Sequence, residues 1–153
     1  MYRSIILRLI VGFSMLPALA SAQASSQSAC AFTVPAGWNQ TATRWDGECR
    51  DGHADGLGVL KEYQQQKVVR FFFGRLEHGE LKLGVIDQAE GFVAAQFANG
   101  KPLPSEDAQR TVDAFTEAEK AANEAVSRFS KAGQQASAKF YTAKAKELRE
   151  QLD

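Results

Sequence analysis

The sequence predicts an α+β protein in which an antiparallel β-meander is followed by a long C-terminal amphipathic α-helix. Two observations support this prediction. Between residues 44 and 103, short β-type runs are separated by turn residues, which is typical of antiparallel hairpins. Residues 104–153 are rich in Ala, Glu, Lys and Gln, and their apolar residues recur at steps of three and four, as on one face of a helix. An export signal is expected to precede both regions.

Residues 1–22 are expected to be a cleaved signal peptide. They contain Arg3 and Arg8, no acidic residue, an apolar run from Leu9 to Leu19 and a closing Ala-Ser-Ala of the small-x-small type. The apolar run is shorter than the ~20 residues that a membrane span needs, so cleavage is favoured over a retained anchor. We therefore expect a periplasmic or secreted protein with no transmembrane segment after cleavage.

The charge balance argues against electrostatically driven partners. The chain has 18 basic and 18 acidic side chains, and loss of Arg3 and Arg8 leaves 16 against 18, a net charge of −2. A nearly neutral protein generates no long-range field that attracts nucleic acid or anionic lipid. We expect no nucleic-acid partner, and the expected partner is another protein.

Cys30 and Cys49, the two cysteines of the chain, are expected to form a disulfide, as is usual in exported proteins. It would close a loop of about 20 residues, contribute about 3 kcal/mol and attach an irregular N-terminal arm, residues 23–43, to the first strand. One alternative is a lipid on Cys30, although the usual aliphatic residue is missing before it. Another is a zinc site with His53 and His78, although no Cys-x₂-Cys pair is present.

The β-region is expected to contain five strands joined by tight turns. Glycine, Asn and Asp recur in these turns, where a positive φ is needed. Residues 100–104 then read as a stiff linker. The predicted strands are residues 44–49, 57–63, 68–76, 81–86 and 92–97.

The β-region also repeats itself with a period of about 27 residues, and a third, fainter copy lies at 93–100. Self-similarity at such a period is typical of repeat architectures. Glycines within the strands would let an aromatic side chain from an adjacent strand lie over the backbone. The repeated positions are Trp45, Gly47, Gly52, Gly56 and Gly58 in the first copy and Phe72, Gly74, Gly79 and Gly84 in the second.

This arrangement of an aromatic residue followed by spaced glycines resembles the MORN repeat (membrane occupation and recognition nexus), a β-hairpin unit that stacks into an elongated, curved sheet. The second copy departs from the pattern at Leu83, which stands where the first has Gly56. The resemblance implies a scaffold for contact with protein or, in some members, phospholipid, and it does not imply an enzyme. A glycine-rich β-meander unrelated to this family is the alternative.

The strand at 68–76 is apolar on both faces. If Phe72 packs on one side, then Val69, Phe71 and Phe73 emerge on the other, and such large side chains should be covered. The covering group could be the C-terminal helix of the same chain, or a partner protein or apolar ligand. Val69, Phe71 and Phe73 are therefore the candidate binding residues.

The helical region is expected to begin with Ser105 as N-cap and to run to about Leu152. Gly133 lies within its apolar stripe without shifting the phase, so one helix is favoured over a hairpin that turns at Gly133. The expected stripe contains Val112, Phe115, Ala122, Val126, Phe129, Ala136, Phe140 and Ala143, with Tyr141, Ala145, Leu148 and Leu152 beside it.

Charge divides this region into two halves. Residues 105–127 contain six acids and two bases, whereas residues 128–146 contain five bases and no acid. The division predicts either compensation of the helix dipole on a solvated face or antiparallel pairing of the halves. That pairing would occur within a hairpin or between two copies in a homodimer.

No catalytic set is recognisable. His53 and His78 are the only candidates for a base near neutral pH, and neither accompanies a nucleophile and a carboxylate at a known spacing. We expect no catalytic residue, no cofactor and no metal site, and the leading function is an exported, non-enzymatic protein-binding or scaffolding module. The alternative is a periplasmic immunity or inhibitor protein that neutralises a toxin or hydrolase. A hydrolase built on one of the histidines is a third reading.

Overall fold

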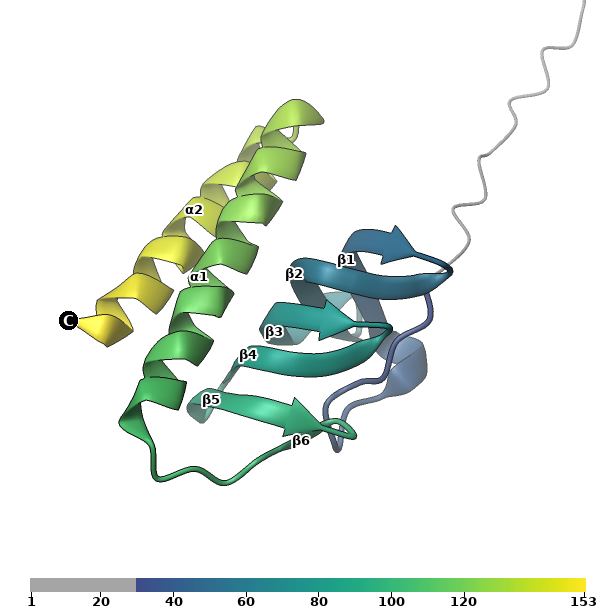
Figure 1. The fold of residues 1–153 in the computed structure, drawn as a ribbon. Coiled ribbons are helices and arrows are strands. Elements are labelled where there is room, and N and C mark those ends of the chain that lie inside the picture. Colours follow the sequence, from purple (N-terminus) through teal and green to yellow (C-terminus); the bar gives the residue numbers. More distant parts are fainter. Residues whose placement is uncertain (1–29) are drawn as a thin grey trace, which may run out of the picture.

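The computed structural model describes residues 30–153 and has two layers, a β-sheet and a helical hairpin (Figure 1). The expected signal peptide, residues 1–22, and the first part of the arm, residues 23–29, lie outside the described residues. The elements are the 3-10 turn η1 (Gln40–Ala42), β1 (Thr43–Arg50), β2 (His53–Gln64), β3 (Lys67–Glu77), β4 (Glu80–Gln88), β5 (Gly91–Ala98), β6 (Lys101–Pro102), α1 (Ala108–Lys131), α2 (Gln135–Arg149) and the 3-10 turn η2 (Glu150–Leu152).

The sheet is an antiparallel meander whose six strands lie in chain order. The five predicted strands are all present, and each is slightly longer than expected. The short β6 was not predicted: it lies in the expected linker, where Lys101 and Pro102 pair with Ala98 and Phe97. The predicted α+β class with an antiparallel meander is confirmed.

Three hairpin turns at one end of the sheet share one conformation. In each, a non-glycine residue with φ near 50° is followed by a glycine with φ between 72° and 82°. Two successive positive φ angles define the type I′ turn, whose twist matches that of the flanking strands. The repeated sequence positions therefore produce repeated geometry at Asp51-Gly52, His78-Gly79 and Asn99-Gly100.

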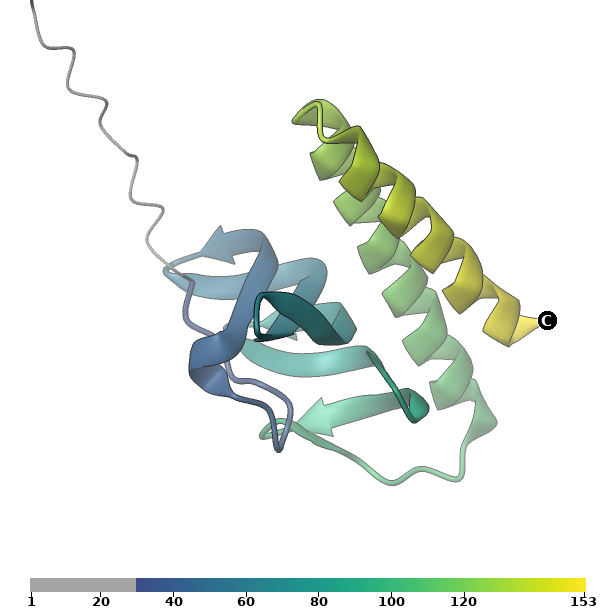
Figure 2. The same ribbon diagram turned by 180° about the vertical axis from the view of Figure 1, so that it is seen from behind.

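Residues 30–39 of the arm run past these three turns on the side of the sheet opposite to the helices (Figure 2). Backbone hydrogen bonds attach it, and a Cβ added at Gly79 would lie 2.8 Å from the carbonyl oxygen of Ala31. Glycine at this turn therefore serves two purposes: it adopts the positive φ and it makes room for the arm. The backbone N–H groups of Ala31, Thr33 and Ala36 donate to the carbonyl oxygens of Gly52, Gly79 and Gly100 respectively, each at 2.8 Å.

Cys30 and Cys49 form the predicted disulfide, with a Cα–Cα distance of 5.7 Å. It joins the start of the arm to the end of β1. Because the sulfur of Cys30 is bonded to Cys49, it cannot carry a lipid, and neither cysteine can bind zinc as a thiolate. Both alternatives for the cysteines are therefore excluded.

Glu62, a buried carboxylate of β2, fixes the end of the arm. It accepts hydrogen bonds from the backbone N–H of Asn39 at 2.7 Å and from the side chain of Arg70. Arg70 also donates to the carbonyl oxygen of Gly37 at 3.1 Å and lies 5.1 Å from the ring centre of Trp38. Burial raises the pKa of Glu62, but the bonds from Arg70 and Asn39 outweigh burial and hold the pKa below its usual value of 4.5.

The arm and the sheet enclose one of two hydrophobic cores. We call this side of the sheet the arm face. Within it, Phe72 and Phe97 pack edge to face with ring centres 5.4 Å apart. The fully or largely buried residues of the arm face are Trp38, Ala54, Leu60, Phe72, Leu76, Leu81, Ile86, Ala95 and Phe97.

A row of glycines crosses the arm face where aromatic rings lie flat on the backbone. The rings of Trp45 and Phe72 each cover a glycine two residues further along the same strand and its partner on the next strand. The expectation that the ring comes from an adjacent strand is therefore wrong for Gly47 and Gly74, which a ring of their own strand covers, whereas Gly58 and Gly84 are each covered by a ring of the neighbouring strand. The row pairs Gly47 with Gly58, Gly58 with Gly74 and Gly74 with Gly84.

The C-terminal region is a helical hairpin, and the expectation of one continuous helix is wrong (Figure 1). Gly133 has φ 73°, the left-handed conformation in which many helices end. The N–H of Gln134 then donates to the carbonyl oxygen of Phe129 at 2.9 Å. Apolar residues continue at steps of three and four past this break, so their spacing does not reveal it, although the buried track of α2 is Ala138, Tyr141, Ala145 and Leu148. The alternative of a hairpin at Gly133 is confirmed.

Alanines line the helical surface that packs on the sheet. We call this side of the sheet the helix face: α1 lies across β2 to β5, and α2 packs along α1. Four members of the expected stripe, Val112, Ala136, Phe140 and Ala143, are instead exposed, Val112 by 41% and Phe140 by 42%. The buried helical residues are Ala114, Phe115, Ala118, Ala121, Ala122, Ala125, Ala138, Tyr141, Ala145 and Leu148.

The start of α1 also differs from expectation. Its N-cap is Asp107, which accepts a hydrogen bond from the N–H of Gln109 at 2.9 Å. Ser105, the expected cap, accepts instead from the N–H of Asp107 at 3.1 Å. Both residues are good caps, and the short β6 delays the helix by moving the chain along the sheet edge.

Candidate functional site

Strand β3 places its two apolar faces in different cores, as its sequence predicts. Phe72 is fully buried on the arm face and Phe73 on the helix face. Tyr141 of α2 covers Phe73 with ring centres 6.2 Å apart. Phe71 is only partly buried, and Val69 is 39% exposed. The helical hairpin therefore covers one of the three candidate binding residues completely and leaves the other two near the surface.

An open groove of about 700 Å³ lies beside Phe71. It runs between the β2–β3 hairpin and the helical hairpin, close to the turn of each. We call it the aromatic groove, because five of its lining side chains are aromatic. Its lining residues are Lys61, Tyr63, Val68, Phe71, Phe129, Ala136, Ser137, Phe140, Tyr141 and Lys144.

Rings from three elements meet in the aromatic groove. The ring centre of Phe71 lies 5.5 Å from that of Phe73 and 5.6 Å from that of Phe140, within the range of favourable aromatic contacts. Phe129 and Tyr141 stack nearly parallel at 5.3 Å. Phe140 keeps 42% of its surface exposed, so the apolar wall of the groove remains accessible.

At one end of the groove the positive charge of Lys144 is fully paired. Lys144 donates to the carboxylates of Asp87 at 2.7 Å and Glu147 at 2.9 Å. Burial lowers the pKa of Lys144, but its hydrogen bonds to the two carboxylates outweigh burial and hold the pKa above its usual value. Lys144 therefore remains charged at neutral pH and is already paired within the protein.

Three ion pairs join the divided charge of the helical region to the sheet. Arg75 of β3 donates to Glu117 of α1 at 2.9 Å, and Arg128 of α1 donates to Asp46 of β1 at 3.2 Å. Between the helices, Arg149 donates to Glu119 at 2.8 Å. The acidic and basic halves therefore do not mainly pair with each other inside the hairpin. A homodimer through the helices stays a prediction.

His53 and His78 both line a second, shallow pocket of about 250 Å³ at the turn end of the sheet. Both side chains are exposed. The carboxylate of Glu80, which also lines this pocket, accepts a hydrogen bond from the hydroxyl of Thr33 at 2.8 Å. The two histidines thus line one pocket. The other residues that line it supply no activated nucleophile of the kind that catalysis by a histidine base requires.

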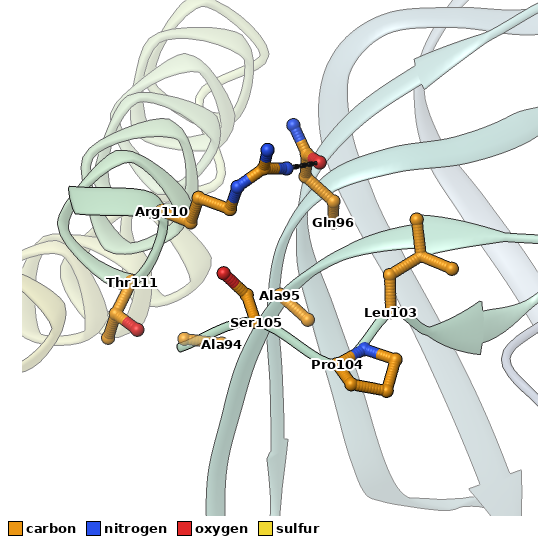
Figure 3. Close-up of a pocket in the computed structure, with 8 residues that line it drawn as sticks. All are labelled: Ala94, Ala95, Gln96, Leu103, Pro104, Ser105, Arg110 and Thr111. Atoms are coloured by element: carbon orange, nitrogen blue, oxygen red, sulfur yellow. Dashed lines mark hydrogen bonds between the residues drawn. The ribbon is translucent and has the colours of Figure 1, made fainter. Parts of the chain in front are cut away.

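A third pocket, of about 50 Å³, lies between β5 and the segment that leads into α1 (Figure 3). Arg110 reaches across it to the side-chain oxygen of Gln96. Leu103 donates its N–H to the carbonyl oxygen of Gln96 at 2.8 Å. The space is about that of a few water molecules, so this pocket serves the attachment of the linker and not the binding of a ligand.

Sequence reasoning identified Phe71 but not the groove beside it, and the valine of β3 that lines the groove is Val68 instead of the expected Val69. Phe129, Phe140 and Tyr141 were expected on one apolar track of a single helix. They face Phe71 only because the chain reverses at Gly133. The one local signal for the reversal was the glycine itself, at a position where a helix can end.

Within residues 30–153, no helix is long and apolar enough to cross a membrane, and no group of three or more His, Cys, Asp or Glu side chains is placed to hold a metal ion. Comparison of the chain with family models, with curated proteins and with solved structures finds no match.

Proposed function

We propose that this protein is an exported, non-enzymatic binding module that uses the aromatic groove to bind a segment of another protein. The observation that carries the proposal is the exposed ring of Phe140, which forms an accessible apolar wall with Phe71. A rigid sheet on one side and a helical hairpin on the other hold this wall in place. Aromatic side chains in such clefts commonly anchor protein partners.

The openness of the groove supports a protein segment over a small molecule as its occupant. Small-molecule sites usually enclose most of the ligand surface, whereas the aromatic groove is open along its length and its ring at position 140 is 42% exposed. An extended peptide needs such an open channel. Export is supported by the disulfide between Cys30 and Cys49, which is stable in an oxidising compartment.

The resemblance to MORN repeats is part of the same proposal. Its support is that three turns of the sheet share one conformation and that two aromatic residues lie over glycines in the same way. On this proposal the repeats form the scaffold. The binding surface belongs to the helix face, outside the repeated positions.

Affinity capture from a periplasmic extract tests the proposed function. We expect the wild-type protein to retain a partner that Phe140→Ser loses, because the substitution removes the exposed ring. Val112→Ser is the matched control, since Val112 is a helical apolar residue with nearly the same exposure, 41%, outside the groove. Equal capture by the wild type and Phe140→Ser would exclude the groove as the binding site.

The identity of the captured protein separates the leading function from its alternative. A structural or assembly protein would support the scaffolding function. A toxin or hydrolase that loses activity on adding the wild type, but not on adding Phe140→Ser, would support an immunity or inhibitor protein. Full function after replacement of His53 and His78 by alanine would exclude the hydrolase.

A further inference from the structure

An unbalanced positive charge adjoins one end of the aromatic groove, where Lys61 lines the groove and Arg44 lies beside it near Tyr63. Arg44 of β1 and Lys61 of β2 are direct cross-strand partners, so their side chains lie on the same face of the sheet. Like charges directly opposite each other on two strands destabilise a sheet. The pair therefore adds no stability of its own, and a bound anion would relieve its repulsion.

A count of the neighbouring carboxylates shows the imbalance. Asp46 lies 3.3 Å from the ammonium of Lys61 and 3.2 Å from the guanidinium of Arg128, so one carboxylate serves two cations. Within residues 30–153, Arg44 has no carboxylate within salt-bridge distance. Three cations thus share one carboxylate at this end of the groove.

These cations lie against the aromatic lining. The guanidinium carbon of Arg44 lies 5.9 Å from the ring centre of Tyr63, and the ammonium of Lys61 lies 5.7 Å from that of Phe129. Such contacts hold a cation beside an apolar surface. At the other end, Asp87 and Glu147 already neutralise Lys144. The groove therefore presents a positive end and an apolar wall side by side.

From this asymmetry we infer that the aromatic groove binds an acidic, apolar peptide segment, in which an Asp or Glu stands next to a large apolar residue. The carboxylate contacts Arg44 and Lys61, and the apolar side chain packs against Phe71 and Phe140. The inference rests on the proposed function and adds the chemistry of the partner. Complementary charge of this kind chiefly determines specificity and the rate of association.

Three synthetic heptapeptides of Gly and Ser test the inference. Each carries one central Phe, flanked by two Glu, two Gln or two Lys, and binding is followed in the amide NMR spectrum of the full mature protein. We expect the Glu peptide to bind about fivefold more tightly than the Gln peptide and to shift the amide signals of Phe71 and Phe140. The advantage should fall as salt is raised, because the contacts lie at the surface.

The variant Arg44→Gln should reduce the advantage of the Glu peptide to less than about twofold without changing binding of the Gln peptide. Arg44 is exposed and donates to no carboxylate within residues 30–153, so this variant should fold normally, which the amide spectrum also reports. Lys101→Gln is the matched control, because Lys101 is an exposed cation of β6 at the opposite edge of the sheet. It should leave both peptides unaffected.

The outcomes separate the two proposals. Equal binding of the Glu and Gln peptides would overturn the acidic partner and leave a protein-binding groove. Absence of shifts at the groove with every peptide would overturn both. Tighter binding of decanoate than of the Glu peptide would identify a lipid ligand and overturn the inference. If the protein self-associates and Phe140→Ser abolishes the association, the occupant is a second copy of this chain. This result would also overturn the inference.

Discussion

The two faces of the sheet are covered in different ways. On the arm face, an irregular segment is attached by backbone hydrogen bonds to three turn glycines and by a disulfide. On the helix face, a helical hairpin is attached by alanine packing and by ion pairs such as Arg128 with Asp46. The arm follows the repeat spacing and closes its core. The hairpin crosses the sheet and leaves the aromatic groove open beside Phe71.

This difference separates stability from binding. Backbone hydrogen bonds hold the arm against the turns. Within residues 30–153, the core of the arm face is therefore closed and has no accessible aromatic wall. Side-chain packing of a helix on a sheet covers only the strands beneath it. Phe72 and Phe73 are both fully buried, Phe72 on the arm face and Phe73 on the helix face beneath the helices. Substitutions on the arm face should therefore affect stability, whereas those in the groove should affect binding.

The largest expected effect is that of Gly74→Val. A Cβ at Gly74 would lie 2.7 Å from the Cα of Gly84 and 2.8 Å from the ring of Phe72, and it would also meet the carbonyl oxygen of Leu83. Backbone atoms on a paired strand cannot move away cheaply. We expect a loss of about 3 kcal/mol or more in the free energy of unfolding, measured by urea denaturation.

Gly91→Ala is the control for this prediction. A Cβ at Gly91 meets no atom within 4 Å, although its φ of 119° is unfavourable for alanine. The substitution should cost only about 1–3 kcal/mol of backbone strain. If Gly74→Val is no more destabilising than Gly91→Ala, the close approach of strands in the glycine row does not limit stability.

Replacing Cys30 and Cys49 with serine should have the next largest effect. Loss of the disulfide frees the start of the arm and should lower the free energy of unfolding by about 3 kcal/mol. The arm face should loosen first, so amide hydrogen exchange should rise at Ala31 and Ala54, which are joined across the arm by backbone bonds. Equal acceleration at Ala121 and Ala125 of α1 would show that the two faces are not independent.

Glu62→Gln should have a smaller effect that depends on pH. The pKa of Glu62 is lower in the folded protein than its usual value of 4.5, so its stabilisation is complete above that value and is lost as the pH falls through the folded pKa. At pH 7 we expect the variant to be about 1–2 kcal/mol less stable. The difference from the wild type should shrink below about pH 4.5, as measured by urea denaturation at several pH values.

Glu117→Gln gives the corresponding measurement on the helix face. Burial raises the pKa of Glu117, but hydrogen bonds from Lys120 and Arg75 outweigh it and lower the pKa overall. The stabilisation by Glu117 should therefore also decline as the pH falls below 4.5, the usual pKa of this carboxyl group. A larger effect for Glu117→Gln than for Glu62→Gln at pH 7 would contradict the view that the arm face is the more firmly attached.

The smallest effect on stability is expected for Phe140→Ser. Its ring is 42% exposed, so the free energy of unfolding should change by less than about 1 kcal/mol. Phe73→Ala, which removes a fully buried ring, should cost about 3–5 kcal/mol. Thermal or urea denaturation of both variants would locate the boundary between the core and the groove. A cost of more than about 3 kcal/mol for Phe140→Ser would place its ring in the core.

Much of the sheet could be predicted because its signals are local. Alternation and turn glycines placed all five main strands, and the spacing of Gly52, Gly79 and Gly100 matched three turns of one conformation. The disulfide was predicted from the two cysteines and the expected export signal. Of the candidate site, only Phe71 could be predicted, because the sequence of a strand shows its two faces but not what lies on them.

The sequence by itself determined the order and pairing of the strands, the repeat geometry of the turns and the two-sided burial of β3. Only the tertiary structure decided which surfaces stay open. The reversal at Gly133, the exposure of Phe140 and the meeting of Arg44 with Tyr63 beside the helices depend on contacts between distant segments. Periodicity records which face of an element is apolar. It does not record how far a covering element extends, and that extent creates the aromatic groove.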